Sequence, residues 1–250
     1  MSDTSFSDAV ILAIDAGNTR IKWGVHDGHA WSATGAIPTR ESAHLYAELR
    51  PWLPVDVAIA SNVAGDGVRT DIEHACKQAG IDLMLIRSER EQLGVVNGYR
   101  DPAQLGSDRW AALIAAHHTE PGHKLVVNAG TALTIDALTA DGRFLGGLIV
   151  PGPALMRRSL DRGTAKLRLT EGELREFPES TPDAITSGAI QACAGAIERL
   201  RDTMAARGSP AGRIILSGGA ASEIAAALSI GSILNENLVL DGLVLIARKS

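Results

Sequence analysis

The hydrophobic and polar positions of this chain follow the same order twice. A short apolar run over residues 10–14 leads into a polar loop at 15–19, after which apolar and polar residues alternate up to an Asp-Gly turn. In the second half an apolar run again leads into a loop, at 128–132, followed by an alternating strand and another Asp-Gly pair. A repeat with a period near half the chain indicates duplicated domains. We therefore expect two tandem domains, residues 1–122 and 123–250.

Each half also combines strands with helices, which is typical of the α/β class. Apolar runs, helical spacing and the Gly or Pro residues at their boundaries predict the further elements. Strands are expected at 55–60, 81–86 and 213–216, and helices at 69–79, 108–118, 153–160, 182–207 and 222–228. In the helix at 108–118, four residues share one face, namely Trp110, Leu113, Ile114 and His117.

The composition of the chain indicates which classes of protein it can belong to. The 250 residues are 45% hydrophobic and 21% charged with a net charge of -5, which is ordinary for a globular protein. Without basic clusters, we expect no nucleic-acid partner held by phosphate neutralisation. No apolar run is long enough to span a membrane, and Met1 opens no recognisable export signal. Cys76 and Cys193 are too distant in sequence for a disulfide framework or a Cys-x-x-Cys metal site, so a reducing cytoplasm is expected.

The first polar loop has the residue types that a polyphosphate requires. Gly17 permits close backbone approach, the loop amides can form a concave anion site, and Asn18 and Thr19 add side-chain donors. Asp15 is suited to face a magnesium ion directly or through water, and Lys22 can reach a phosphate. Taken alone, the loop is better explained as a β-hairpin turn, for which Gly-Asn is ordinary. The duplication shifts this balance, because two similar hairpins could hold opposite sides of one nucleotide.

The segment Gly106-Ser107-Asp108-Arg109 stands at the start of a predicted helix. Ser107 suits an N-cap, and Asp108 in the first turn complements the helix dipole. Capping does not explain Arg109, because a cation in the first turn opposes the dipole. An anionic partner such as a carboxylate explains it better. From the residues alone, a structural and a functional interpretation are equally supported.

Other patterns that carry chemistry are weak or missing. The sequence has no Walker A motif, no Gly-x-Gly-x-x-Gly after a strand, no Gly-x-Ser-x-Gly elbow and no His-Glu-x-x-His. P-loop, Rossmann, serine hydrolase and zinc chemistry are therefore disfavoured. The Gly218-Gly219 turn would let a base or ribose approach the backbone, but it is also a common connection between a strand and a helix.

Together the motifs resemble the type III pantothenate kinase family. The resemblance rests on Asp-x-Gly-Asn-Thr at 15–19, Val-Asn-Gly-Tyr at 96–99 with Pro102, Leu-Gly-Ser-Asp-Arg at 105–109, and Ala-Gly-Thr-Ala at 129–132 with Thr134 and Asp136. The order and spacing of these motifs span nearly the whole chain. The resemblance implies an α/β fold of two tandem ribonuclease H-like domains, as in actin, sugar kinases and heat-shock ATPases.

The resemblance also implies ATP-dependent phosphorylation of the 4′-hydroxyl of pantothenate, the first step of coenzyme A biosynthesis, by a Mg2+-using cytoplasmic homodimer. Asp108 matches the catalytic base of the family. The pantothenate-binding positions match Tyr99, Gly106, Ser107, Asp108, Arg109 and, across a dimer interface, Thr181. The ATP-binding positions match Asp15, Ala16, Gly17, Asn18, Thr19, Arg20, Ile21, Lys22 and Thr131, with Asp15 also facing Mg2+.

One position departs from the family's pattern. Where the family usually has Asp as a ligand for an activating monovalent cation, K+ or NH4+, this chain has Asn128. An amide oxygen can still bind such a cation but brings no charge, so we expect weaker binding. Two other functions stay open: a kinase for another small hydroxy acid, and a catalytically silent or moonlighting regulator of the same fold.

Overall fold

A computed structural model of the protein describes residues 9–163 and 171–249. The first eight residues, on which the expectation of no export signal depends, lie outside this part. The chain forms two compact units, one of Met1–Thr119 with Asn237–Ser250 and one of Glu120–Glu236. The division falls close to the expected boundary, but the last residues belong to the first unit and not to the second. No described helix is both long enough and apolar enough to cross a membrane.

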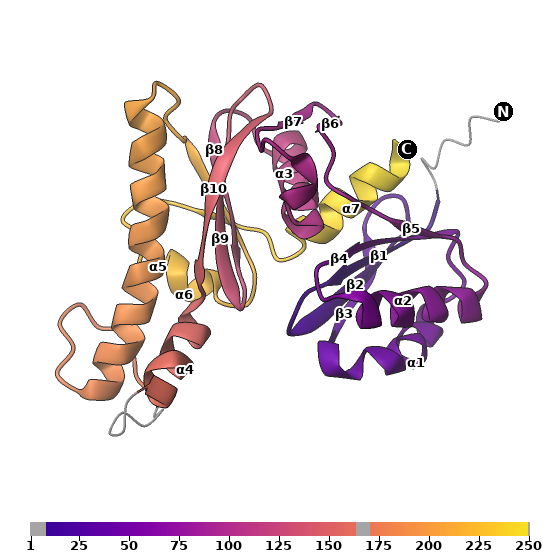
Figure 1. Ribbon diagram of the computed structural model, residues 1–250, viewed down its shortest axis with the longest axis horizontal. Helices are drawn as coiled ribbons and strands as arrows, with labels where there is room; N and C mark the ends of the chain where they lie inside the picture. Colours follow the sequence, from indigo (N-terminus) through magenta and orange to yellow (C-terminus); the bar gives the residue numbers. More distant parts are fainter. Residues whose placement is uncertain (1–8, 164–170, 250) are drawn as a thin grey trace. The chain divides into compact units, whose positions relative to one another are not determined.

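The first unit is built on one mixed sheet (Figure 1). Its five strands are β1 (Ile11–Ala16), β2 (Arg20–His26), β3 (Trp31–Pro38), β4 (Val57–Asn62) and β5 (Leu83–Leu85). They lie in the order β3-β2-β1-β4-β5, with β1 to β3 antiparallel and β4 and β5 parallel to β1. Because β1 and β4 are parallel neighbours, the polar residues at their carboxyl ends meet at one edge of the sheet.

Helices cover both faces of this sheet. The elements are the helices α1 (Leu45–Leu49), α2 (Asp66–Ala79), α3 (Ser107–Thr119) and α7 (Leu238–Arg248), the 3-10 turns η1 (Thr39–His44), η2 (Arg50–Trp52) and η3 (Pro102–Gln104), and the short hairpin of β6 (Glu91–Gln92) and β7 (Val95–Asn97). On one face, Leu45 of α1 and Ile72 of α2 pack into a core with Leu12 and Ile14 of β1. On the other face α7 packs against β1, β4 and α3.

The apolar spacing of α3 predicts one buried face, but α3 is buried on more than that face. The packing of α7 against α3 accounts for the difference. Ala111, Ala112, Ala115 and Ala116 of α3 are buried together with the expected apolar residues. A Cβ on Gly242 of α7 would lie 1.9 Å from the carbonyl oxygen of Ala111, so the two helices are in direct backbone contact. The last helix therefore completes the core of the first unit, which the linear order of the motifs did not indicate.

The second unit repeats the topology of the first (Figure 1). Its strands are β8 (Lys124–Ala129), β9 (Ala132–Leu138), β10 (Arg143–Pro151), β11 (Arg213–Ser217) and β12 (Ile233–Leu234). Within the unit they lie in the order β10-β9-β8-β11-β12, with β8 to β10 antiparallel and β11 and β12 parallel to β8. The equivalence of the two strand orders confirms the duplication that the sequence pattern predicts.

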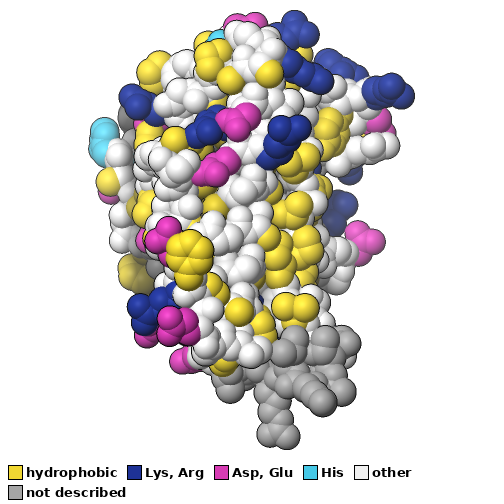
Figure 2. Space-filling model, turned by 90° about the vertical axis from the view of Figure 1, so that its left-hand side faces the viewer, with side chains coloured by type: hydrophobic (Ala, Val, Ile, Leu, Met, Phe, Trp, Pro, Cys, Tyr) yellow, Lys and Arg dark blue, Asp and Glu magenta, His cyan; other side chains and the backbone are white. Residues whose placement is uncertain are grey.

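One long helix dominates the second unit. Its helices are α4 (Pro153–Gly163), α5 (Thr181–Ala206) and α6 (Ala221–Ala225). Cys193 and Ile197 of α5 lie in one core cluster with Leu133 and Ile135 of β9. The side of α5 that faces away from the sheet carries exposed small residues, and apolar side chains gather along the middle of the face shown in Figure 2. The small exposed residues are Ala184, Gly188, Ala192 and Gly195.

Candidate active site

The loop after β1 is a tight hairpin that the start of η1 holds in place. The Gly17 N–H donates to the Arg20 carbonyl at 3.1 Å and closes the turn. Thr39 donates twice to this loop, from its hydroxyl to the Gly17 carbonyl at 2.6 Å and from its N–H to the Thr19 carbonyl at 3.0 Å. Asn18 and Thr19 remain exposed at the tip. The loop backbone is therefore fixed while its tip is open to a ligand.

The other residues of this predicted ATP-binding segment differ in what they can offer. The side chains of Ala16 and Ile21 are completely buried in the sheet core, so only their main chain can meet a nucleotide. Arg20 is exposed, and Lys22 is half-buried in β2, directly opposite Asp15.

Asp15 carries a buried carboxylate oxygen without a hydrogen-bond partner. Among the described residues none donates to its Oδ1. Burial, and next the negative charge of Asp108, raise the pKa of Asp15 to about 7, although Lys22 opposes the shift. An unpartnered carboxylate in such a place is costly, and a cation relieves that cost. Asp15 therefore fits a ligand of Mg2+, which is commonly held by one or two carboxylates with phosphate oxygens and water. In the described part of the chain no cluster of three or more His, Cys, Asp or Glu could hold a metal ion.

Helix α3 begins differently from the capping pattern that its sequence predicts. The Trp110 N–H donates to the Gly106 carbonyl at 3.0 Å, so Gly106 occupies the cap position and Ser107 belongs to the first turn. The Asp108 Oδ1 accepts from the Arg109 N–H at 2.8 Å. Asp108, and not Ser107, thus satisfies a free N–H of the first turn. The hydroxyl of Ser107 instead lies 2.9 Å from that of Ser61.

The carboxyl group of Asp108 is held in a largely desolvated position. Burial raises its pKa above the usual range, while the Arg109 N–H and guanidinium lower the pKa and only partly offset that effect. Because its pKa is raised, Asp108 is a better proton acceptor than an exposed carboxylate.

Arg109 lies buried against Tyr99. Its Nη1 donates to the Tyr99 hydroxyl at 3.3 Å, and its Cζ lies 5.8 Å from the centroid of the ring. Only 5% of the Arg109 surface is exposed. A guanidinium held this way offers planar donors for a carboxylate while it keeps little water around it.

Arg90 and Asn97, which are not among the predicted site residues, fix the segment that carries Tyr99. Arg90 donates to the carbonyls of Asn97 at 3.1 Å, Tyr99 at 2.8 Å and Arg100 at 2.9 Å. The buried Asn97 accepts from the Tyr99 N–H at 3.0 Å and donates to the Pro102 carbonyl at 3.3 Å. The contribution of Arg90 had no local signal, because its acceptors are all main-chain atoms.

The loop after β8 is enclosed by backbone on two sides. The Gly130 N–H donates to the Ala132 carbonyl at 3.0 Å, as the equivalent glycine does in the first hairpin. A Cβ on Gly152 would lie 2.2 Å from the Gly130 carbonyl oxygen, and one on Gly218 would lie 2.5 Å from that of Ala129. Three main-chain segments therefore meet with no room for side chains between them.

The remaining predicted site residues also lie in the second unit. Asn128 is half-buried at the end of β8, and Thr131 is exposed in the loop. Thr181 is the exposed first residue of α5, next to Ser180, whose hydroxyl accepts from the Asp183 N–H at 3.2 Å. Asp15, Asp108 and the Arg109–Tyr99 pair therefore belong to the first unit. Asn128, Thr131 and Thr181 belong to the second unit.

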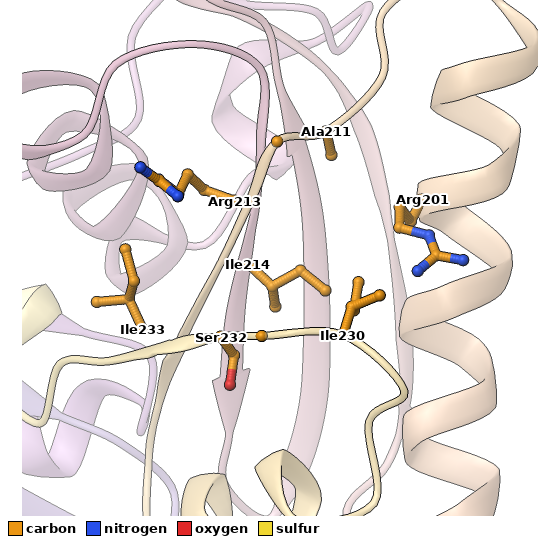
Figure 3. A pocket seen from close by; sticks show the side chains of 9 residues that line it. Arg201, Ala211, Arg213, Ile214, Ile230, Ser232 and Ile233 are labelled. Atoms are coloured by element: carbon orange, nitrogen blue, oxygen red, sulfur yellow. The ribbon is translucent and has the colours of Figure 1, made fainter.

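One hollow of the second unit is not part of this site. It has a volume of about 560 Å³, and Ile214 and Ile230 are among the residues that line it (Figure 3). Arg213 begins β11, whereas the loop at Gly130 follows the carboxyl end of the parallel strand β8, so the hollow lies at the opposite edge of the sheet. The side chains of Arg201 and Arg213 point to opposite sides of it (Figure 3).

Comparison with known proteins agrees with these features. A family model described as type III pantothenate kinase matches residues 11–203. The type III pantothenate kinase of Nitrosospira multiformis is 43% identical over 241 residues, which cover 96% of this chain and 92% of that protein. The chain belongs to the type III pantothenate kinase family.

Solved structures place the type III pantothenate kinase fold among the actin-like and sugar-kinase folds. A putative Baf family transcriptional activator from Campylobacter jejuni has a TM-score of 0.59 at 18% identity, covering 95% of this chain and 98% of that one. A ROK family glucokinase from Streptomyces griseus has a TM-score of 0.53 at 12% identity, covering 96% of this chain and all of the other, 100%. At such identities the likeness concerns the fold alone, which confirms the expected pair of ribonuclease H-like domains.

Proposed function

We propose that this chain transfers the γ-phosphoryl group of ATP to the 4′-hydroxyl of pantothenate, the first step of coenzyme A biosynthesis. The observation that carries the proposal is the buried carboxylate of Asp108, fixed at the start of α3 beside the Arg109–Tyr99 pair. A second carboxylate, that of Asp15, lies close enough for the negative charge of Asp108 to raise its pKa. A proton acceptor, a carboxylate receptor and a cation ligand are thus grouped in one unit.

Pantothenate is held through its carboxylate and its hydroxyl groups. Arg109 supplies a charged, planar pair of donors for the carboxylate, and Tyr99 keeps the guanidinium in place. Ser107 and the main chain of Gly106 border the same helix start and contact the polar groups of the substrate. This arrangement supplies the anionic partner that the position of Arg109 requires.

Asp108 orients the attacking hydroxyl and accepts its proton. Phosphoryl transfer passes through a loose transition state, so the main tasks of the protein are alignment of the nucleophile and neutralisation of charge. The proton leaves the hydroxyl late, when its acidity has risen. A carboxylate with a raised pKa is suited to accept it at that stage.

Each of the two equivalent hairpin loops offers donors for the phosphates of ATP. The amides of Gly17, Asn18 and Thr19 and the hydroxyl of Thr131 are proposed as phosphate contacts, with Lys22 as a nearby positive charge. Asp15 would hold Mg2+ directly or through water. When bound, Mg2+ would supply positive charge that neutralises the negative charge developing on the phosphate oxygens.

The monovalent cation is the least supported part of the family pattern in this chain. Asn128 can offer an amide oxygen but no charge at the end of β8. We propose that K+ or NH4+ binds weakly or is dispensable. Turnover measured from zero to high KCl, at constant ionic strength, tests this, and Asn128→Asp should then strengthen the response to K+.

We further propose a cytoplasmic homodimer formed through the outer side of α5. This side has exposed small residues, among them Gly188 and Gly195, where added Cβ atoms would meet none of the described atoms within 4 Å. Phe177, which is 84% exposed, precedes the same helix. Thr181 at the start of α5 would reach the pantothenate of the partner. A Gly188→Arg variant that stays dimeric by light scattering would contradict this assignment.

The test is an ADP-release assay on purified protein with ATP, Mg2+ and pantothenate. We expect pantothenate-dependent turnover, and a loss of at least about a hundredfold in kcat for Asp108→Asn, the usual contribution of a general base. Asp66→Asn, an exposed aspartate at the start of α2, is the matched control and should keep the wild-type rate. Near-normal turnover by Asp108→Asn, with substrate binding unchanged, would remove Asp108 from the role of base.

Two other outcomes correspond to the functions left open by the sequence. Turnover with another hydroxy acid, but none with pantothenate, would indicate a different acceptor on the same phosphate loops. Folded protein that binds ATP but phosphorylates no acceptor would indicate a regulator.

A further inference from the structure

Ser61 is a buried polar residue that neighbours Asp15 in the sheet and contacts Ser107, and no part of the mechanism above uses it. It lies near the end of β4, directly opposite Asp15 of β1 in the parallel pair. Its side chain has 0% exposure, and its Oγ is 2.9 Å from the Oγ of Ser107. A single hydrogen bond thus joins the sheet edge that carries Asp15 to the first turn of the helix that carries Asp108.

The direction of this hydrogen bond follows from the surroundings of the two hydroxyls. Each serine has one hydrogen to donate. Among the described residues, Ser107 is the one hydrogen-bond partner of the Ser61 side chain. If Ser61 only accepted, its own hydrogen would be buried without an acceptor, which costs about 1–3 kcal/mol. This cost favours Ser61 as the donor and Ser107 as the acceptor.

The consequence concerns the hydrogen of Ser107. Because Ser107 accepts from Ser61, its own hydrogen is left out of the pair. Ser107 retains some exposure, 8% against 0% for Ser61, so its hydrogen can turn towards a ligand at the start of α3. The Ser61 contact fixes where the Ser107 oxygen lies and which directions remain for its hydrogen.

We propose that Ser61 is a positioning residue for the acceptor substrate: it donates to Ser107 and thereby leaves the Ser107 hydroxyl as an oriented donor to a polar oxygen of pantothenate. This proposal rests on the proposed function, in which Ser107 contacts the substrate. Ser61 itself touches no substrate. Its effect must therefore pass entirely through Ser107.

A double-mutant cycle tests this dependence. Ser61→Ala should raise the KM for pantothenate about five- to tenfold, the range expected for one lost hydrogen bond, and leave the KM for ATP within about twofold. Ser107→Ala should raise the KM for pantothenate at least as much. The double variant should be no worse than Ser107→Ala alone, because the Ser61 contact has no function without its acceptor.

A second substitution separates the hydrogen bond from packing. Ser61→Cys nearly keeps the side-chain volume but has only a weak S–H donor, so it should reproduce the KM increase even if Ser61→Ala folds poorly. Ser42→Ala is the matched control, because Ser42 is also a buried serine but donates to Asp71 of α2. It should affect thermal stability and not the KM for pantothenate.

The outcomes distinguish this proposal from the function on which it rests. Additive effects of the two serine variants, or a Ser61→Cys protein with wild-type KM values, would overturn the positioning role while pantothenate turnover by the wild type still upheld the kinase. Absence of pantothenate turnover in the wild type would overturn the function itself, and the positioning role with it.

Discussion

The carboxylate of Asp108 lies directly against the backbone of Gly106. A Cβ added to Gly106 would be 2.5 Å from the Asp108 Oδ1, closer than any real contact of this kind. The absence of a side chain at position 106 is therefore a condition for the present place of the proposed base. In the Gly-Ser-Asp-Arg motif, the glycine thus leaves room for the Asp108 carboxylate, and the aspartate supplies the proposed base.

Gly106→Ala should displace the Asp108 carboxylate and lower kcat by about tenfold or more, because a base that is misplaced by a fraction of an ångström loses alignment. The KM for ATP should change little. Gly67→Ala is the control: Gly67 lies in α2, and an added Cβ would meet none of the described atoms within 4 Å. Steady-state kinetics of both variants check the prediction, and equal kcat values would contradict it.

The raised pKa of Asp108 predicts the acid side of the pH profile. The base must be ionised to accept a proton, and burial moves its pKa above the ordinary range of a carboxyl group. Activity is therefore complete well above this pKa and falls as the pH falls through it. Values of kcat/KM for pantothenate, measured from pH 9 down through the acid range with saturating Mg2+ and ATP, should decline at a higher pH than an ordinary carboxyl group would give. A decline at or below the pH of an ordinary carboxyl group would contradict the prediction.

Asp15 makes a prediction about stability. Its pKa in the folded protein is raised to about 7 from an ordinary value of 3.8, so between these values the folded state binds more protons than the unfolded state. Stability then falls as the pH rises through this window and levels off above about pH 7. In the absence of Mg2+, Asp15→Asn removes the penalty, so its gain in unfolding free energy should be larger at pH 8 than at pH 5.

The gain in unfolding free energy from Asp15→Asn should be about 2–3 kcal/mol larger at pH 8 than at pH 5. This follows from 1.36 kcal/mol per pH unit over the interval between pH 5 and about pH 7. Urea unfolding of both proteins at the two pH values measures it. The same variant should lose activity despite its higher stability, because the proposed Mg2+ ligand is gone. A gain that does not change with pH would show that Asp15 ionises normally in the folded protein.

Much of the fold follows from the sequence because local signals repeat. The apolar runs, the two Gly-containing loops and the Asp-Gly turns define the same succession in each half, and the strand orders are equivalent. The position of α7 does not follow, because its packing on α3 depends on a distant residue, Gly242, that meets the backbone at Ala111. A long-range contact of this kind leaves no periodic signal near either residue.

The same distinction applies to the site. Asp15, Asp108 and Arg109 can be proposed as site residues from residue type and position at the ends of elements. Ser61 and Arg90 cannot, since their proposed roles depend on which atoms come within hydrogen-bond distance after folding. Residue type predicts Ser107 as the cap, and the structure instead gives that position to Gly106.

Arg90 should act on the acceptor substrate through Tyr99. Its guanidinium donates hydrogen bonds to the carbonyls of Asn97, Tyr99 and Arg100. Arg90→Ala should therefore loosen Tyr99 and, through Tyr99, Arg109. We expect the KM for pantothenate to rise about tenfold, with little change in the KM for ATP. Arg87→Ala, which removes an exposed arginine three residues earlier, is the control. A rise in both KM values to the same extent would argue for a general loss of structure.

The adjacent glycines 218 and 219 give a matched pair for the second loop. Gly218 has a φ of +96° and would place a Cβ 2.5 Å from the Ala129 carbonyl oxygen, so alanine there is strained in its backbone and collides with the loop. Gly219 has neither problem, since a Cβ there meets no described atom within 4 Å.

Gly218→Ala should therefore lower the unfolding free energy by about 1–3 kcal/mol and raise the KM for ATP several-fold, because the Ala129 to Thr131 loop must move. Gly219→Ala should be close to wild type in stability. If it raises the KM for ATP on its own, a nucleotide approaches the backbone at Gly219 itself. Thermal unfolding with and without ATP and Mg2+ separates these effects, and equal stability of the two variants would contradict the steric argument.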